Sequence, residues 1–186
     1  MSKIVVLNGS PRVKGCTAAL VEEIVKGAGE QGAEVKLFNV NNMTIKGCQS
    51  CYACRPEGRC ILQDDMQELY GEIAEAQGIV FATPVYMWQM TAQLKLVLDR
   101  LYPFLRSDHT SRLTPGKKVL LAATQARPDQ AMFHQYFEYV SRLFSFLGFG
   151  TCEILIAGGT RKPEDVLEQA AIIAEARRLG GWLAIG

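Results

Sequence analysis

Residues 3–17 read KIVVLNGSPRVKGCT, and the pattern in this stretch decides the fold. The apolar run from Lys3 to Leu7, followed by a turn signal at 8–11, predicts a strand that ends in a loop. From Thr17 to Gln31 apolar residues recur on one helical face, and Gly32 follows as a stop, so a helix is predicted there. A buried strand that leads through a loop into a helix is the repeating unit of α/β proteins.

The alternation of strands and helices continues to the end of the chain. Further strands are predicted at Glu34–Asn39, Gly78–Thr83, Lys118–Thr124 and Cys152–Ala157. Further helices are predicted to open at Asp64-Asp65 and to cover Thr91–Tyr102, Gln130–Leu147 and Pro163–Leu183. This order implies an α/β fold, a three-layer α/β/α sandwich around a five-stranded parallel sheet. No linker or repeat interrupts it, so we expect one domain over residues 1–186 with a cysteine-rich insertion at about 40–63.

The composition is that of an ordinary globular protein. The chain has 186 residues, of which 48% are hydrophobic and 21% charged, and its formal net charge is +1. This balance provides no broad basic surface for nucleic acid or for an anionic membrane. The apolar run after Met-Ser-Lys is too short for a signal peptide, and no run approaches the ~18 apolar residues of a membrane span. We therefore expect a cytoplasmic protein with neither nucleic acid nor a membrane as partner.

The first loop after a strand is a candidate phosphate site, because ligands of open parallel sheets bind beyond the carboxyl ends of the strands. It runs from Gly9 to Thr17 and offers small residues, hydroxyls, backbone amides and the guanidinium of Arg12. Unpaired amides at a helix N-terminus together with a cation suit a phosphate dianion. The glycine spacing matches neither a P-loop nor the G-x-G-x-x-G turn. The alternative is an ordinary turn in which Thr17 caps the helix.

The loop after the third strand, TPVYMWQM at 83–90, is apolar where a loop tip is normally polar. Its aromatic and methionine side chains suit a flat apolar partner such as an isoalloxazine ring. In the alternative interpretation, Tyr86 and Trp88 pack under a neighbouring loop or subunit. The loop after the fourth strand, Thr124 to Pro128, supplies further donors for the far side of a ring.

Four of the six cysteines fall in one block, namely Cys48, Cys51, Cys54 and Cys60. About 24 residues separate Asn39 from Asp64, far more than the ~2–6 of an ordinary connection, and such length commonly signals function. Cysteines at i, i+3 and i+6 with a fourth six residues later can converge on one cubane cluster. Zinc, a Cys-x-x-Cys redox disulfide and thiols without metal are the alternatives.

Other notable residues have simpler explanations. Asp64 and Asp65 are explained by capping of the helix that they open. His109 and His134 lack ligand-spaced partners, and no residue stands out as a general acid or base. The phenylalanine-rich segment 133–149 is expected to be core or a subunit contact. Together with the apolar tip at 87–90 it exceeds what a small domain readily buries, so we expect a homo-oligomer, a dimer or a tetramer.

The NADPH-dependent FMN reductase-like branch of the flavodoxin superfamily resembles this chain in several motifs. These are Gly9-Ser10-Pro11-Arg12, Gly15-x-Thr17, Thr83-Pro84-Val85-Tyr86 and Gln93-Leu94-Lys95 through Asp99-Arg100. Within that branch, the cysteine block followed by Asp64-Asp65-Met66 resembles the iron–sulfur flavoproteins. The likeness runs from Lys3 to about Arg100. It implies a flavodoxin-like sheet and FMN as cofactor.

The resemblance also implies which residues hold FMN. Ser10, Arg12 and Thr17 are placed on the phosphate, and the loop from Pro84 to Trp88 on the ring. Relatives often carry asparagine where this chain has Cys16, so Cys16 is expected to contribute its backbone amide. The complete expected set is Ser10, Arg12, Gly15, Cys16, Thr17, Pro84, Val85, Tyr86, Met87, Trp88, Thr124 and Gln125.

We therefore expect an FMN-binding electron-transfer oxidoreductase whose cysteine block holds a [4Fe–4S] cluster. NAD(P)H or ferredoxin is expected as the electron donor, and a small molecule as the acceptor. Two alternatives stay open: a cluster-free NAD(P)H-dependent FMN or quinone reductase, and a non-enzymatic flavin-binding carrier or regulator. An iron assay distinguishes the cluster-free reductase from the cluster-containing protein. Steady turnover with NAD(P)H and an acceptor would argue against a non-enzymatic carrier.

Overall fold

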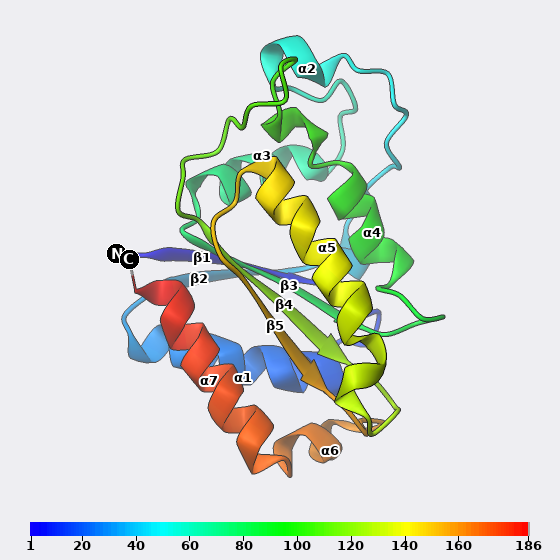
Figure 1. The fold of residues 1–186 in the computed structure, drawn as a ribbon, viewed down its shortest axis with the longest axis vertical. Coiled ribbons are helices and arrows are strands. Elements are labelled where there is room, and N and C mark those ends of the chain that lie inside the picture. The colour runs from blue at the N-terminus through cyan, green and yellow to red at the C-terminus, as the bar shows by residue number, and fades with distance from the viewer. Residues whose placement is uncertain (186) are drawn as a thin grey trace.

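The computed structural model describes residues 1–185, so Gly186, the last residue of the predicted domain, lies outside the described residues. Its centre is a five-stranded sheet of order β2-β1-β3-β4-β5 (Figure 1). The strands are β1 Lys3–Asn8, β2 Glu34–Asn39, β3 Gly78–Pro84, β4 Lys118–Thr124 and β5 Cys152–Ala157. Every neighbouring pair is parallel, so all the strands end at the same edge. The predicted fold class is confirmed, and the strand order is the flavodoxin-like one.

Helices cover both faces of the sheet (Figure 1). One layer holds α1 Cys16–Glu30, α6 Pro163–Leu167 and α7 Ala170–Ala184. The other layer holds α3 Met66–Glu75, α4 Ala92–Asp99 and α5 His134–Leu147. The connections contain a short helix, α2 Cys54–Glu57, and the 3-10 turns Val40–Asn42, Tyr102–Phe104 and Gln130–Phe133. In Figure 1, α2 stands at the top of the molecule, far from the lower end at which α6 lies.

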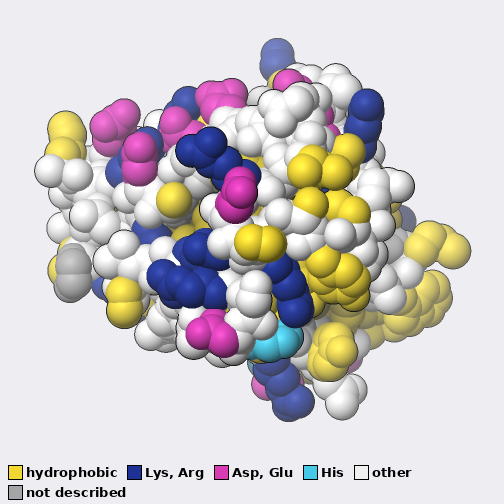
Figure 2. All heavy atoms as spheres, turned by 90° about the horizontal axis from the view of Figure 1, so that it is seen from above, with side chains coloured by type: hydrophobic (Ala, Val, Ile, Leu, Met, Phe, Trp, Pro, Cys, Tyr) yellow, Lys and Arg dark blue, Asp and Glu magenta, His cyan; other side chains and the backbone are white. Residues whose placement is uncertain are grey.

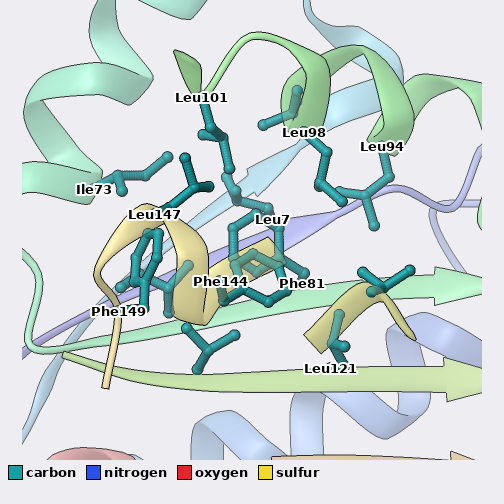
Figure 3. Packing of buried hydrophobic residues seen from close by; sticks show 14 of the residues in the cluster. Leu7, Ile73, Phe81, Leu94, Leu98, Leu101, Leu121, Phe144, Leu147 and Phe149 are labelled. Atoms are coloured by element: carbon teal, nitrogen blue, oxygen red, sulfur yellow. The ribbon is translucent and has the colours of Figure 1, made fainter. Parts of the chain in front are cut away.

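Alternate residues of the strands supply the two halves of the core. Ile4 belongs to the cluster packed against α1 and α7, whereas its neighbour Val5 belongs to the cluster under α3, α4 and α5. In the second cluster the ring centroids of Phe81 and Phe144 lie 4.7 Å apart (Figure 3). Because strands covered on both faces are apolar throughout, continuous runs such as IVVL are the signal that predicted them.

The predicted last helix is two helices in the structure. Gln169 stands between α6 and α7 with φ −88° and ψ 82°, outside the helical conformation. Its Nε2 donates to the carbonyl oxygens of Gly158 at 3.0 Å and Asp165 at 2.7 Å. These bonds fasten the non-helical turn between α6 and α7, a break that no glycine or proline signals in the sequence.

Two other helices also differ from the predicted ranges. The predicted Thr91–Tyr102 helix ends at Asp99, because Pro103 has no N–H to donate to the Asp99 carbonyl. The first turn of the predicted 130–147 helix is a 3-10 turn, whose start is capped by Asp129 accepting the amide of Ala131 at 2.9 Å.

Two glycines let α1 and α7 approach each other closely. A Cβ atom on Gly27 would lie 2.0 Å from the carbonyl oxygen of Arg177, and one on Gly180 would lie 2.0 Å from that of Ile24. Only a hydrogen atom fits at these positions, so the two helix backbones rest on each other. A Cβ on Gly29, two residues along α1, would meet nothing within 4 Å.

Replacing Gly27 by alanine is expected to destabilise the protein by ~1–3 kcal/mol, because the two helix backbones must move apart. The matched change Gly29→Ala should instead stabilise it by ~0.5–1 kcal/mol, since alanine favours the helix and the space is open. Denaturant unfolding followed by circular dichroism measures both free energies. Equal effects of the two changes would contradict the close-packing argument.

Candidate functional site

One pocket lies at the carboxyl edge of the sheet, where the loops after β1, β3, β4 and β5 meet. Asn8 is in register with Ala82, and Pro84 with Thr124, so these loops leave the sheet side by side. The pocket encloses about 90 Å³, and we call it the sheet-edge pocket. Its lining residues are Ser10, Arg12, Cys16, Thr17, Pro84, Val85, Tyr86, Thr124, Gln125, Ala126 and Thr160. The structure thus brings together the residues that the sequence predicted for FMN, except Gly15, Met87 and Trp88.

The N-terminus of α1 opens onto this pocket without a capping side chain. Gly15 is the N-cap residue, no side chain caps the helix, and its first turn carries no carboxylate. A Cβ on Gly15 would lie 3.1 Å from the Cβ of Arg12 and 3.6 Å from its Nε, so glycine lets the Arg12 side chain fold back over the helix start. Unpaired first-turn amides and a guanidinium therefore lie at one place, the combination that binds phosphate.

Thr17 has a different role from the cap that the alternative interpretation assigned to it. Its Oγ1 lies 2.8 Å from the Oγ1 of Thr124, and both side chains are buried. The capping alternative is therefore wrong. The contact ties the first turn of α1 to the end of β4 and places two hydroxyls in the wall of the sheet-edge pocket.

The first loop is held in shape by its own side chains. The amide of Ser10 donates to Oδ1 of Asn8 at 3.0 Å, and the amide of Arg12 donates to Oγ of Ser10 at 3.2 Å. Gly9 touches the next loop: its carbonyl accepts the Thr91 hydroxyl at 2.8 Å. These bonds order the loop before any ligand binds, which reduces the entropy that binding would cost.

Gln125 carries a buried acceptor without a partner. Its Nε2 donates to the carbonyl oxygens of Arg127 at 3.1 Å and Asp129 at 2.6 Å, while its Oε1 is buried and has no partner among the described residues. An unpaired buried acceptor costs ~1–3 kcal/mol, so a ligand N–H in the sheet-edge pocket would relieve that cost. The amide of Thr160 fixes the same residue by donating to the Gln125 carbonyl at 2.9 Å.

Thr160 is a lining residue that the sequence analysis missed. Its signal was the Gly158-Gly159-Thr160 turn, which follows the fifth strand and so lies at the same sheet edge. The carboxyl ends of four strands, β1, β3, β4 and β5, therefore contribute residues to this pocket.

The apolar tip of the loop after β3 is a tight two-residue hairpin. The amide of Tyr86 donates to the carbonyl of Gln89 at 2.9 Å, and the reverse bond measures 3.0 Å. Met87 and Trp88 at its tip have positive φ angles of 45° and 70°, a conformation that favours glycine or asparagine. They are 89% and 66% exposed, so Tyr86 lines the pocket while the tip projects into solvent.

A second, separate pocket holds the cysteine block at the end of the molecule where α2 lies. It encloses about 160 Å³, and we call it the cysteine pocket. Its lining residues are Cys48, Gln49, Ser50, Cys51, Tyr52, Cys54, Cys60, Ile61, Leu62, Tyr70, Asp99, Arg100, Tyr102 and Pro103. Figure 2 looks down on this end and shows Lys and Arg side chains close to exposed apolar ones. All four cysteines of the block therefore face one space, which shares no lining residue with the sheet-edge pocket.

The thiols of this block are free and influence one another. None of the six cysteines of the described chain is in a disulfide. Burial raises the pKa of the Cys54 thiol, and the nearby thiols of Cys60, Cys48 and Cys51 raise it further. Within residues 1–185, no three Cys, His, Asp or Glu side chains converge closely enough to hold a single metal ion. Among the described residues, the four cysteines line one pocket without forming such a ligand group.

The sequence predicted Asp64 as a helix cap, but capping is not its main role in the structure. Its Oδ1 does accept the amide of Met66 at 3.2 Å, but its carboxylate forms a buried ion pair with Arg100. Burial alone would raise the pKa of Asp64, and the hydrogen bonds from Arg100 and from the amide of Lys46 hold that pKa below its ordinary value. Asp65 does not cap either: its Oδ2 accepts the amide of Thr44 at 2.6 Å. Arg100 is thus a residue of this region whose role the sequence did not show.

The phenylalanine-rich segment is core and not an exposed face. Phe133, Phe137, Phe144 and Phe149 are buried, and of the segment's phenylalanines only Phe146 is exposed. The argument that this segment exceeds what one domain can bury is therefore wrong, because α5 packs these rings onto the sheet. Only the hairpin tip still supports a homo-oligomer.

The chain is similar to known flavin reductases and iron–sulfur flavoproteins. Residues 2–141 match the family described as NADPH-dependent FMN reductase. An iron–sulfur flavoprotein of Methanocaldococcus jannaschii is 32% identical over 133 residues, covering 72% of this chain and 68% of the relative. One of Archaeoglobus fulgidus is 42% identical over 106 residues, covering 57% and 54%. The matches thus span about half to two thirds of the length of these relatives.

The fold also has close counterparts among solved structures. An FMN-dependent NADH-azoreductase from Bacillus anthracis, solved with FMN, superposes with a TM-score of 0.77 at 15% identity, covering 99% of this chain and 100% of that one. At that identity the likeness concerns the fold alone. Among the described residues, no helix has both the length and the apolar character needed to cross a bilayer.

Proposed function

This chain belongs to the NADPH-dependent FMN reductase family and is a flavin-dependent oxidoreductase, and from that premise we propose that it is an iron–sulfur flavoprotein. In this proposal FMN binds in the sheet-edge pocket, and Cys48, Cys51, Cys54 and Cys60 hold a [4Fe–4S] cluster. The protein is then a single FMN-binding domain with a cluster-binding insertion at about 40–63.

The observation that carries the flavin site is the joint position of the uncapped start of α1, Arg12 and the unpaired acceptor of Gln125. The first two suit a terminal phosphate, and the third suits an N–H of a flat polar ring edge. Ser10, Thr17 and Thr124 add hydroxyls, and Pro84, Val85 and Tyr86 provide an apolar wall. When bound, FMN supplies hydride and single-electron chemistry, and the protein supplies position and electrostatics.

The cluster proposal is supported by the arrangement of the thiols. A single zinc ion needs its sulfur ligands ~2.3 Å from one point, whereas each cysteine of a [4Fe–4S] cluster binds a different iron atom. Four cysteines that line one pocket could each bind a different iron atom of one cluster. The likeness to iron–sulfur flavoproteins of Methanocaldococcus jannaschii and Archaeoglobus fulgidus adds to this support.

The family points to a nicotinamide as electron donor, and ferredoxin is the second candidate. We propose a small-molecule acceptor and a cytoplasmic location. The second candidate function, a cluster-free NAD(P)H-dependent FMN or quinone reductase, is favoured by the lack of a converging metal site within residues 1–185. A non-enzymatic carrier does not fit a reductase family.

The experiment that tests the proposal is purification without oxygen, followed by a visible spectrum and assays of flavin, iron and sulfide. We expect FMN and not FAD, because the sheet-edge pocket offers one phosphate site. A yellow protein with FMN but no iron after anaerobic reconstitution would favour the cluster-free reductase. Protein that takes up no added FMN would overturn the proposal as a whole.

Arg12→Ala is expected to weaken FMN binding by ~1.5–3 kcal/mol, or about 10- to 150-fold in Kd, because a charged hydrogen bond to phosphate is lost. The matched control is Lys14→Ala, which removes an exposed cation of the same loop that does not line the pocket. Quenching of flavin fluorescence on titration measures both. Equal losses would mean that only the net charge of the loop matters.

A further inference from the structure

One buried ion pair stands at the base of the cysteine segment, residues 47–63. The Arg100 and Asp64 side chains are 1% and 2% exposed. Two parallel hydrogen bonds join them, Nη1 to Oδ2 at 2.8 Å and Nη2 to Oδ1 at 3.1 Å. Asp64 is the residue at which the segment returns to the body of the protein, so this pair anchors its outgoing end to the end of α4.

The same pair also hydrogen-bonds to the backbone of Lys46, at the incoming end of the segment. Nη1 of Arg100 donates to the Lys46 carbonyl at 2.7 Å, and the Lys46 amide donates to Oδ2 of Asp64 at 3.0 Å. Both ends of the segment therefore meet at one guanidinium. No other described side chain that lines the cysteine pocket hydrogen-bonds to both Lys46 and Asp64.

Arg100 also faces the thiols. It lines the cysteine pocket together with Tyr70, whereas Asp64 does not line it. The Tyr70 hydroxyl accepts the Nε–H of Arg100 at 3.3 Å and donates to the Arg100 carbonyl at 2.8 Å. The guanidinium is thus held in one orientation, with its positive charge in the wall of the pocket.

We propose that Arg100 is the positioning residue of the cysteine pocket: it closes the base of segment 47–63 so that the four thiols face one space before a metal binds. The cost of closing a loop rises with its length, and a bond that fixes both ends removes that cost from cluster assembly. The inference rests on the proposed function and deepens it, because it assigns the assembly of the site to a residue outside the cysteine motif.

The test compares Arg100→Gln with Arg100→Lys. In metal-free protein, hydrogen exchange of the amides at 46–63 should speed up by at least ~10-fold in Arg100→Gln, because the segment loses its closed base. Iron bound after anaerobic reconstitution with ferrous iron and sulfide should fall below about a tenth of the wild-type content. Arg100→Lys keeps a positive charge and a hydrogen-bond donor, so it should bind more iron than Arg100→Gln but less than the wild type. It serves alone if Arg100→Gln does not fold.

The matched control is Glu23→Gln in the layer of α1 and α7. Glu23 is buried, and the change removes its ion pair with Arg177. It should leave the iron content unchanged. In loaded protein, Arg100→Lys should lower the reduction potential of the cluster, because the shorter side chain draws the positive charge away from the pocket wall. Glu23→Gln should leave that potential unchanged.

Unchanged exchange and iron in the Arg100 variants would overturn the inference, as would an equal loss of iron in Glu23→Gln. The outcomes also separate this inference from the proposed function. If wild-type protein takes up no iron while Arg100→Gln still loosens 46–63, the cluster proposal fails and the positioning role stands. If Arg100→Gln binds iron as the wild type does, the cluster proposal stands and the positioning role fails.

Discussion

Replacing Cys51 by serine is expected to remove the iron of this protein while leaving FMN bound. The wild-type content should be about four iron atoms per chain, that of a [4Fe–4S] cluster, and the variant content near zero. Thiolate is the ligand that the cluster requires, and a serine hydroxyl does not ionise in the same range. FMN should stay because the sheet-edge pocket shares no residue with the cysteine pocket.

The matched control for this change is Cys152→Ser, which removes a thiol of β5 that lies outside the block. Burial raises the pKa of Cys152 to about 12, so this thiol stays protonated and is a poor ligand. Iron, sulfide and flavin assays on anaerobically reconstituted protein measure all three forms. Full iron content in Cys51→Ser, or loss of iron in Cys152→Ser as well, would show that the block is not the cluster site.

Replacing Trp88 by glutamate is expected to convert the homo-oligomer that the sequence predicts into monomers. Trp88 and Met87 form a strained, exposed apolar tip, and a tip of this kind is stabilised when a second copy covers it. Burial of a large apolar side chain is worth ~1.5–3 kcal/mol, and a two-fold axis uses the contact twice. The change should therefore weaken a dimer by ~3–6 kcal/mol, at least a hundred-fold in Kd.

Light scattering at micromolar concentration measures this change in mass. The matched control is Phe146→Glu, the same kind of substitution at an exposed aromatic residue of α5, which should leave the oligomer intact. If Phe146→Glu dissociates the protein and Trp88→Glu does not, the contact lies on α5. A wild-type protein that is a stable monomer would overturn the prediction of a homo-oligomer itself.

The sequence alone determined the sheet, its parallel direction and the loops that form the sheet-edge pocket. Apolar runs such as IVVL and helical periodicity arise from local chemistry, so they can be read without tertiary contacts. Parallel strands end at a common edge, so Ser10, Pro84 and Thr124 had to come together once the strands were recognised. The grouping of the cysteines in one connection was likewise visible from their spacing.

Only the tertiary structure decided which side chains of these loops and helices are buried and which are exposed. In the loop after β3, the sequence offered Tyr86, Met87 and Trp88 equally, and the hairpin turned the first inward and the other two outward. In α5, Phe144 became core because it reaches Phe81 on the sheet, a contact across 63 positions that no local pattern shows. Burial depends on what lies opposite, and that is set by the packing of distant elements.

The same reason explains why Asp64 was misread and why the role of Arg100 was not foreseen. An aspartate before a helix has an ordinary local explanation, a cap, and no local pattern around Arg100 indicates a buried partner. Their pairing across 36 positions exists only because the fold brings the chain before α3 to the end of α4, where both side chains are closed to water. Charged residues are buried only when a partner is supplied, and the partner is a property of the fold.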